Sequence, residues 1–136
     1  SSNSEEFRKK VHIFVQLEAQ KIAEKHSVKC DFKIIKGYPN LYNNPDFTQK
    51  CKKISQSFLE KDEVKDLDLR MSSEDFSYFS QNCPSCFFRL GVANSRKGIT
   101  HLVHTPYFNI DEECLEIGVG LMSYITIVNL LTQKKI

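Results

Sequence analysis

The sequence has no excess of one charge, no internal repeat and no low-complexity tract. Its 19 Lys and Arg residues are balanced by 17 Asp and Glu residues, and the basic residues are scattered along the chain. A nucleic-acid-binding surface needs clustered positive charge, so this balance argues against a nucleic-acid partner. Hydrophobic residues make up 40% of the chain and aromatic residues 11%. This content is high enough for a globular core and argues against disorder.

The sequence also lacks an uninterrupted apolar run that could cross a bilayer, which takes about 20 residues. The longest apolar stretch spans residues 115–131 and is interrupted by Glu116, Gly118, Gly120, Ser123 and Asn129. We therefore expect a core helix here and no membrane partner.

The first six residues contain neither an initiator Met nor the basic and apolar stretches of a secretory signal peptide. We therefore expect the chain to be a piece of a longer protein. Its five cysteines are an odd number, and three of them lie on apolar faces of predicted elements. Buried, unpaired cysteines are typical of reduced proteins, so we predict a cytoplasmic location.

Two periodicities follow one another in the N-terminal part of the chain. An amphipathic helix over about 5–25 is predicted by the apolar residues Phe7, Val11, Phe14, Val15 and Ile22. The segment 28–34 alternates apolar and charged residues, which predicts a half-buried strand. Asn44 is then placed as the N-cap, and Pro45 as the first residue, of a second helix.

The C-terminal part combines short elements with one long helix. Residues 61–63 are predicted to form a polar loop, 64–69 a short strand and 86–91 an interior strand. Residues 72–75 resemble a capping box before a short helix through Tyr78 and Phe79. The last helix is predicted from the N-cap Asp111 to about Leu131, and it is apolar on nearly all sides. We expect such a helix to be buried in something larger.

Two motifs suggest metal or redox chemistry, but their context argues against it. Cys83 and Cys86 have the C-x-x-C spacing of redox dithiols, yet they end a helix and open a strand instead of the reverse. With His101 and His104 they approach a zinc-finger pattern, but only two residues separate the histidines. A small zinc or thiol module is therefore kept only as a third hypothesis.

Three segments in order resemble one enzyme family. They are Met-Ser-Ser-Glu-Asp-Phe-Ser-Tyr-Phe at 71–79, Pro-Ser-Cys-Phe-Phe-Arg-Leu-Gly at 84–91 and His-Thr-Pro-Tyr-Phe-Asn-Ile-Asp-Glu at 104–112. The family is that of metal-dependent amidohydrolases and peptidases, which includes aminoacylase, hippurate hydrolase, N-acetyl-diaminopimelate deacetylase and indole-3-acetyl-amino-acid hydrolase. The turn-rich residues 37–45 resemble the family's return from its lid to its catalytic domain.

The resemblance implies a fold and an activity. It implies an α/β catalytic domain around two divalent metal ions, zinc or manganese, with an inserted α+β lid that mediates dimerisation. Residues 1–38 would then be the latter half of the lid, 39–44 the hinge and 45–136 the C-terminal portion of the catalytic domain. The expected substrate is an N-acyl amino acid or short peptide, and the expected partners are a second copy, through the lid, and the remaining N-terminal part of the enzyme.

The resemblance also assigns site residues. It implies that His104 is a metal ligand and that Glu74 and Asp75 lie on the substrate side, with Asp75 a candidate acceptor for the second ring nitrogen of His104. From the residues alone, Glu74 and Asp75 would be acids that stabilise a helix N-terminus. Ser72 and Ser85 stand where the family usually has glycine.

Other family motifs are absent from the sequence. No Gly-His-Asp occurs, and the pairs Glu5-Glu6 and Glu112-Glu113 are not placed as the catalytic Glu-Glu pair. We therefore predict no catalytic residue in this chain and no activity when it is isolated. The alternative is a non-catalytic dimerisation or assembly piece whose segment 28–34 pairs with a partner's strand edge.

Overall fold

The computed structural model describes residues 5–70 and 74–133. Along these residues the order of elements is α1 (Glu5–Lys25), α2 (Pro45–Phe58), η1 (Lys61–Glu63), α3 (Ser77–Ser80), η2 (Ser95–Lys97) and α4 (Glu113–Gln133). The chain divides into two compact units. The first unit comprises residues 1–42 and 69–85, and the second comprises residues 43–68 and 86–136.

Helix α1 of the first unit confirms the predicted helix over 5–25. It ends in a Schellman motif, in which a left-handed residue turns the chain out of the helix. That residue is Ser27, with φ 54°. The Ser27 N–H donates to the Glu24 carbonyl at 3.1 Å, and the Val28 N–H donates to the Ala23 carbonyl at 3.0 Å. The backbone itself therefore explains the unusual conformation of Ser27.

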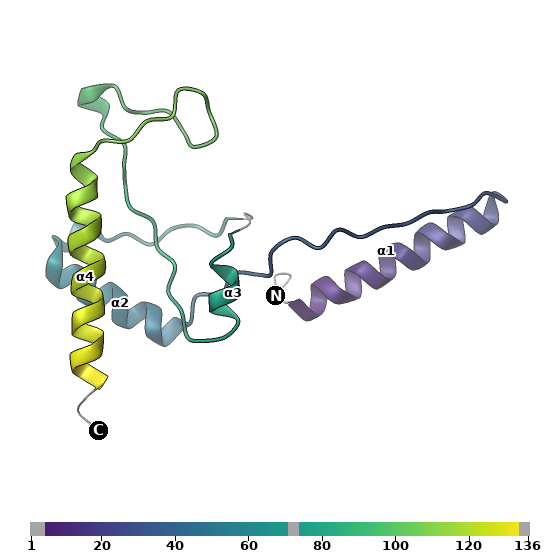
Figure 1. The fold of residues 1–136 in the computed structure, drawn as a ribbon, viewed down its shortest axis with the longest axis horizontal. Coiled ribbons are helices and arrows are strands. Elements are labelled where there is room, and N and C mark those ends of the chain that lie inside the picture. Colours follow the sequence, from purple (N-terminus) through teal and green to yellow (C-terminus); the bar gives the residue numbers. More distant parts are fainter. Residues whose placement is uncertain (1–4, 71–73, 134–136) are drawn as a thin grey trace. The chain divides into compact units, whose positions relative to one another are not determined.

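The chain after α1 runs back beside the helix without regular secondary structure (Figure 1). Side chains at the start of α1 hold the far end of this segment. The Arg8 guanidinium donates to the Gly37 carbonyl at 2.9 Å and to the Tyr38 carbonyl. The Asn40 N–H donates to the Glu5 carboxylate at 2.6 Å. The return segment is thus fastened by polar contacts at one end of the helix.

Helix α3 is a single turn that begins after Glu74 and Asp75. The Glu74 carbonyl accepts from the Ser77 N–H at 3.2 Å, and the Asp75 carbonyl accepts from the Tyr78 N–H at 3.0 Å. The Gln81 side-chain amide donates to the Asn40 carbonyl at 2.7 Å, which ties the end of α3 to the segment that follows α1. The short helix through Tyr78 and Phe79 is confirmed, while Ser72 and Ser73 of the predicted capping box lie outside the described residues.

Helix α2 of the second unit starts as predicted. Pro45 is its first residue, and the Asn44 side chain accepts from the Phe47 N–H at 2.9 Å. The predicted polar loop at 61–63 is instead the 3-10 turn η1, because the Glu63 N–H donates to the Glu60 carbonyl at 3.0 Å. Helix α4 begins at Glu113, two residues after the predicted N-cap Asp111, whose carboxylate accepts from the Glu113 N–H at 3.4 Å.

The core of the second unit lies where α2 crosses α4 (Figure 1). Its buried residues are Cys51 and Ile54 of α2 and Leu121 and Ile125 of α4, and the partly buried residues around them are Phe47, Leu59, Cys86, Tyr124 and Val128. Two glycines let other side chains approach α4 closely. A Cβ at Gly118 would lie 2.8 Å from Leu90 Cδ2, and a Cβ at Gly120 would lie 2.8 Å from Phe58 Cζ.

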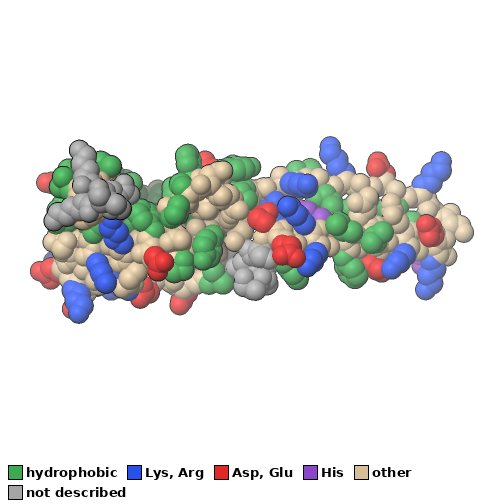
Figure 2. All heavy atoms as spheres, turned by 90° about the horizontal axis from the view of Figure 1, so that it is seen from below, with side chains coloured by type: hydrophobic (Ala, Val, Ile, Leu, Met, Phe, Trp, Pro, Cys, Tyr) green, Lys and Arg blue, Asp and Glu red, His purple; other side chains and the backbone are tan. Residues whose placement is uncertain are grey.

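Most of the large apolar side chains of α4 outside this core are exposed. They include Leu115, Val119, Met122, Ile127, Leu130 and Leu131. Hydrophobic side chains also appear among charged ones in the space-filling view (Figure 2). By length and composition alone, Glu113–Thr132 could cross a membrane, and 17% of its most apolar window is buried. The core helix of a soluble protein meets the same criterion, so the property by itself does not place α4 in a bilayer.

The predicted strands over 28–34, 64–69 and 86–91 are wrong for the described part of the chain, which is mostly helical and contains no β-strand. The predicted α/β class is therefore not confirmed. The physical reason is that a strand exists only beside a hydrogen-bonded neighbour, whereas a helix satisfies its own backbone. At 86–91 one side chain takes the neighbour's place: the Asn43 amide accepts from the Phe87 N–H at 2.7 Å and donates to the Phe87 carbonyl at 2.8 Å.

Candidate functional site

The strongest candidate residue, His104, lies in the second unit on the loop between η2 and α4. Its φ is 66°, in the left-handed region that few residues with a side chain adopt. Ser27 is the other described non-glycine residue with positive φ, and there a helix cap explains it. No helix ends at His104. Its conformation is therefore imposed by the loop, and such positions cluster at functional sites.

Local contacts form a tight turn around His104. The Thr105 hydroxyl donates to the Leu102 carbonyl at 2.9 Å. The rings of His101 and Tyr107 face each other across the turn, with centroids 5.4 Å apart. The side chains on this turn, including the His104 imidazole, are exposed. Nothing in the spacing of His101 and Tyr107 predicts their contact, and the sequence placed His101 only in the zinc-finger-like pattern kept as a third hypothesis.

A second set of contacts closes the base of the loop. Asn94 and Ile99 form an isolated antiparallel bridge, with N–H to carbonyl distances of 2.8 and 2.9 Å. Gly98, with φ 71°, turns the chain between them. The Asp111 N–H donates to the Val92 carbonyl at 2.9 Å, which brings the end of the loop beside its beginning.

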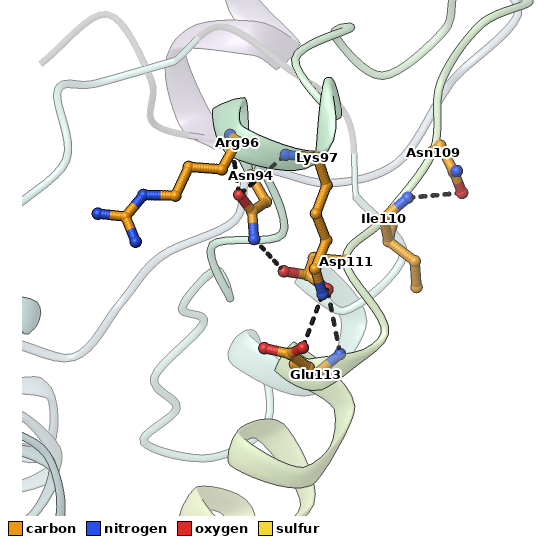
Figure 3. A network of polar contacts seen from close by, with 7 residues as sticks. All are labelled: Asn94, Arg96, Lys97, Asn109, Ile110, Asp111 and Glu113. Carbon is orange, nitrogen blue, oxygen red and sulfur yellow. Dashed lines mark hydrogen bonds and ion pairs between the residues drawn. The ribbon is translucent and has the colours of Figure 1, made fainter.

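Asp111 is the centre of the polar network at this base (Figure 3). Its side chain is 12% exposed. One carboxylate oxygen accepts from the Asn94 amide at 2.6 Å, and the other accepts from the Lys97 ammonium at 2.7 Å. Lys97 also donates to the Glu113 carboxylate at 2.7 Å. Sequence reasoning gave Asp111 only the role of a helix N-cap, because its partners at 94 and 97 are distant along the chain.

These contacts shift the pKa values of the paired groups. Hydrogen bonds from Lys97 and then from Asn94 lower the pKa of Asp111, since they favour the charged carboxylate. Hydrogen bonds to Asp111 and Glu113 raise the pKa of Lys97 for the same reason. Both groups are therefore charged across the neutral pH range, and the network at the loop base is an ion pair.

Glu74 and Asp75, predicted on the substrate side, lie in the first unit, while His104 lies in the second. Glu74 is half-buried and Asp75 is exposed, and within the described part of the chain neither carboxylate forms a hydrogen bond or an ion pair. Their backbone carbonyls open α3. The role of Asp75 as an acceptor for His104 stays a prediction.

Two serines, Ser72 and Ser85, stand where the family usually has glycine. Ser85 is 5% exposed, and its hydroxyl donates to the Cys83 carbonyl at 2.9 Å. The hydroxyl therefore satisfies a backbone group at a position where glycine would leave it to other partners. Ser72 lies outside the described residues.

The cysteines have no arrangement typical of a redox or zinc site. All five are free. The Cys83 thiol contacts the Phe79 carbonyl at 3.5 Å and the Ser85 hydroxyl at 3.6 Å. Cys86 instead lies beside Cys51 in the core, where burial and then this neighbouring thiol raise the pKa of Cys51 to about 11. A thiol with a raised pKa is a poor nucleophile at neutral pH.

The described residues do not by themselves form a metal centre. Between 5 and 70 and between 74 and 133, no three His, Cys, Asp or Glu side chains lie close enough to hold an ion. An exposed imidazole on a tight turn is nevertheless suited to be one ligand among several. The role of His104 as a metal ligand stays a prediction.

Comparison with known proteins gives matches along most of the chain. The model of peptidase family M20/M25/M40 matches residues 3–127. Thermostable carboxypeptidase 1 of Saccharolobus solfataricus is 30% identical over 118 residues, which cover 86% of this chain and 29% of the carboxypeptidase. IAA-amino acid hydrolase ILR1-like 6 of Arabidopsis thaliana is 31% identical over 84 residues, 62% of this chain and 18% of the hydrolase.

An uncharacterized hydrolase of Staphylococcus epidermidis is 36% identical over 107 residues, which cover 74% of this chain and 27% of that protein. The chain therefore spans less than a third of the length of each of these relatives. No solved structure matches the chain.

Proposed function

Because this chain belongs to the peptidase family M20/M25/M40, we propose that it is part of a metal-dependent hydrolase that cleaves the amide bond of N-acyl amino acids or short peptides. The relatives are named a carboxypeptidase and an IAA-amino acid hydrolase, and those names support this substrate class. The observation that carries the proposal is the family match over residues 3–127, which includes the exposed, left-handed His104.

In this proposal His104 supplies one imidazole ligand to one of two divalent ions, zinc or manganese. When bound, such ions acidify a water molecule and polarise the scissile carbonyl. The left-handed turn presents the imidazole away from the packed core, since the whole turn is exposed. Glu74 and Asp75 are assigned to the substrate side.

The general base and the remaining ligands are assigned to other parts of the enzyme. The sequence contains no Gly-His-Asp motif and no suitably placed Glu-Glu pair. We assign residues 1–38 to the lid through which two copies pair, 39–44 to the hinge and 45–136 to the catalytic domain, and we expect a cytoplasmic enzyme. The segments 28–34, 64–69 and 86–91 would become strands there, which would complete an α/β fold. The strand-like pairing of Phe87 with Asn43 supports this for 86–91.

The test compares the full-length protein with the isolated 136-residue chain. Both are incubated with N-acetyl and N-benzoyl amino acids and with zinc or manganese. We expect turnover by the full-length protein only, and loss of that turnover on addition of a chelator. Turnover by the isolated chain, or full-length activity indifferent to the chelator, would contradict the proposal. A full-length protein without activity that still forms dimers would favour the alternative, a non-catalytic assembly piece.

A further inference from the structure

The left-handed backbone of His104 is spanned locally by one side-chain hydrogen bond, from the Thr105 hydroxyl to the Leu102 carbonyl. At Ser27 the Schellman hydrogen bonds hold the conformation, but His104 lies in a loop whose side chains from 100 to 109 are all exposed. A residue with a side chain seldom adopts the left-handed region unless its surroundings favour it. Besides the hydrogen bond across the turn, the contacts at the two ends of the loop are the ones that can hold this conformation.

We infer that Asn94, Lys97 and Asp111 are positioning residues that close the loop 94–111 and thereby fix the backbone of His104. Asp111 joins the two ends of this loop through its N–H, which donates to the Val92 carbonyl, and through both carboxylate oxygens, whose bonds to Asn94 and Lys97 are drawn in Figure 3. The three residues belong to one compact unit with His104. The inference rests on the proposed function only where it concerns metal binding.

Asp111 is the central residue of the three, because its carboxylate binds the other two. A carboxylate accepts from several donors at once, and here it accepts from the Asn94 amide and the Lys97 ammonium on separate oxygens. Its side chain is only 12% exposed, so water competes poorly for these bonds. Asp111 also precedes α4, whose packing on α2 anchors that end of the loop. The other end is anchored by the Asn94–Ile99 bridge.

The direct test is amide hydrogen exchange in the 136-residue chain. Asp111→Asn places an amide donor opposite Lys97 and Asn94 while keeping the shape of the side chain. We expect the amides of Asn94 and Ile99, which are hydrogen-bonded in the bridge, to exchange roughly tenfold faster, because loop ends open once their closure is lost. Exchange in the middle of α4 should not change. Lys97→Ala should act in the same direction, and Lys97→Arg should restore slow exchange because it keeps the charge.

Matched controls come from the same loop. Arg96→Ala removes an equal charge from η2, where only the Arg96 backbone N–H contributes a bond. Asn109→Ala removes an amide whose only described bond is to the neighbouring Ile110 N–H, at 2.9 Å. Both variants should exchange like the unsubstituted chain. If Asp111→Asn and Lys97→Ala behave like these controls, or if α4 loosens equally in all variants, the inference is overturned.

A second arm measures zinc affinity in the full-length protein. We expect Asp111→Asn to raise the zinc dissociation constant about tenfold, because loss of a residue that orients a metal ligand has an effect of this size in metalloproteins. His104→Ala is the reference. If His104→Ala leaves zinc binding unchanged, the proposed function is wrong, while the exchange experiment still decides whether the loop is closed by Asp111. If His104→Ala weakens zinc binding and Asp111→Asn does not, the positioning role is wrong.

Discussion

The two units differ in what holds their elements together. In the first unit, α1 has one buried residue, Ala23, and its return segment is fastened by polar contacts of Arg8 and Glu5. In the second unit, α2 and α4 bury an apolar cluster between them. Among the described residues each unit also contains one left-handed residue with a side chain, and local backbone bonds explain Ser27 but not His104. His104 thus lies in the unit that has a core of its own.

The largest difference between the units should appear at these two left-handed residues. In the full-length protein, His104→Ala should lower kcat by orders of magnitude, because one ligand of a metal ion is removed. Ser27→Ala should leave kcat nearly unchanged. Metal stoichiometry, kcat and the thermal midpoint are measured for both, with His101→Ala, which removes the ring that lies against Tyr107, expected to have a small effect. Full metal content and near-normal kcat in His104→Ala would show that His104 is no more important for activity than Ser27.

The core of the second unit should respond strongly to truncation. Ile125, which is 8% exposed, packs in the cluster between α2 and α4, whereas Ile13 of α1 is 61% exposed. Ile125→Ala should lower the free energy of unfolding of the chain by about 2–4 kcal/mol, because it leaves a cavity. Ile13→Ala should cost less than about 0.5 kcal/mol. Urea unfolding followed by circular dichroism measures both, and equal losses would show that the units do not differ in this way.

Helix α2 should depend on its N-cap. Asn44→Ala removes the side-chain oxygen that accepts from the Phe47 N–H, and we expect a loss of about 1 kcal/mol in the free energy of unfolding. Asn44→Asp keeps that acceptor and serves as the control, with little loss expected. The same urea titration detects the difference. An unchanged midpoint for Asn44→Ala would mean that packing alone determines where α2 begins.

A smaller effect of opposite sign is expected at the end of α1. Ser27→Gly should raise the free energy of unfolding by roughly 0.5 kcal/mol, because the steric cost that a side chain adds at positive φ exceeds the extra flexibility of glycine in the unfolded chain. The control is His26→Gly, at the neighbouring exposed residue, whose φ is not positive and which should therefore be destabilised. Urea titration measures both variants. A loss of stability in Ser27→Gly would contradict the Schellman assignment.

The smallest effect is expected at Cys83, which lies outside the core of the second unit. Cys83→Ser should leave metal content, activity and stability of the full-length protein nearly unchanged, because the thiol is exposed and its contacts suit a hydroxyl equally well. Cys51→Ser, in the core, is the contrasting variant and should destabilise the protein. Loss of one bound zinc ion per chain in Cys83→Ser would support a small zinc module.

The helices could be predicted because their causes are local. The sequence Asn44-Pro45 and the periodicity of Phe7, Val11 and Phe14 lie within the helices or next to them. The strands were wrong for the described chain because pairing depends on neighbours far along the sequence, and no periodicity reveals whether those neighbours are present.

The candidate site was predictable only in part. Resemblance of the segment 104–112 to a known family picked out His104, but nothing near it in the sequence indicates its left-handed backbone. The contact between Asn94 and Asp111 joins residues 17 positions apart. Asn and Asp are common in loops and at helix starts, so their presence at 94 and 111 did not indicate that the two side chains contact each other.

The two glycines of α4 favour one rotation of the helix about its own axis. Gly118 admits Leu90 and Gly120 admits Phe58, and residues two apart on an α-helix point in directions about 200° apart. Leu90 from the segment 86–91 and Phe58 from α2 therefore contact nearly opposite sides of the helix, each at a position without a side chain. Rotating α4 by one residue would place a branched or bulky side chain of α4 against Leu90 or Phe58. The two contacts therefore favour the observed rotation of α4, in which Asp111, just before the first turn, is oriented toward Asn94 and Lys97.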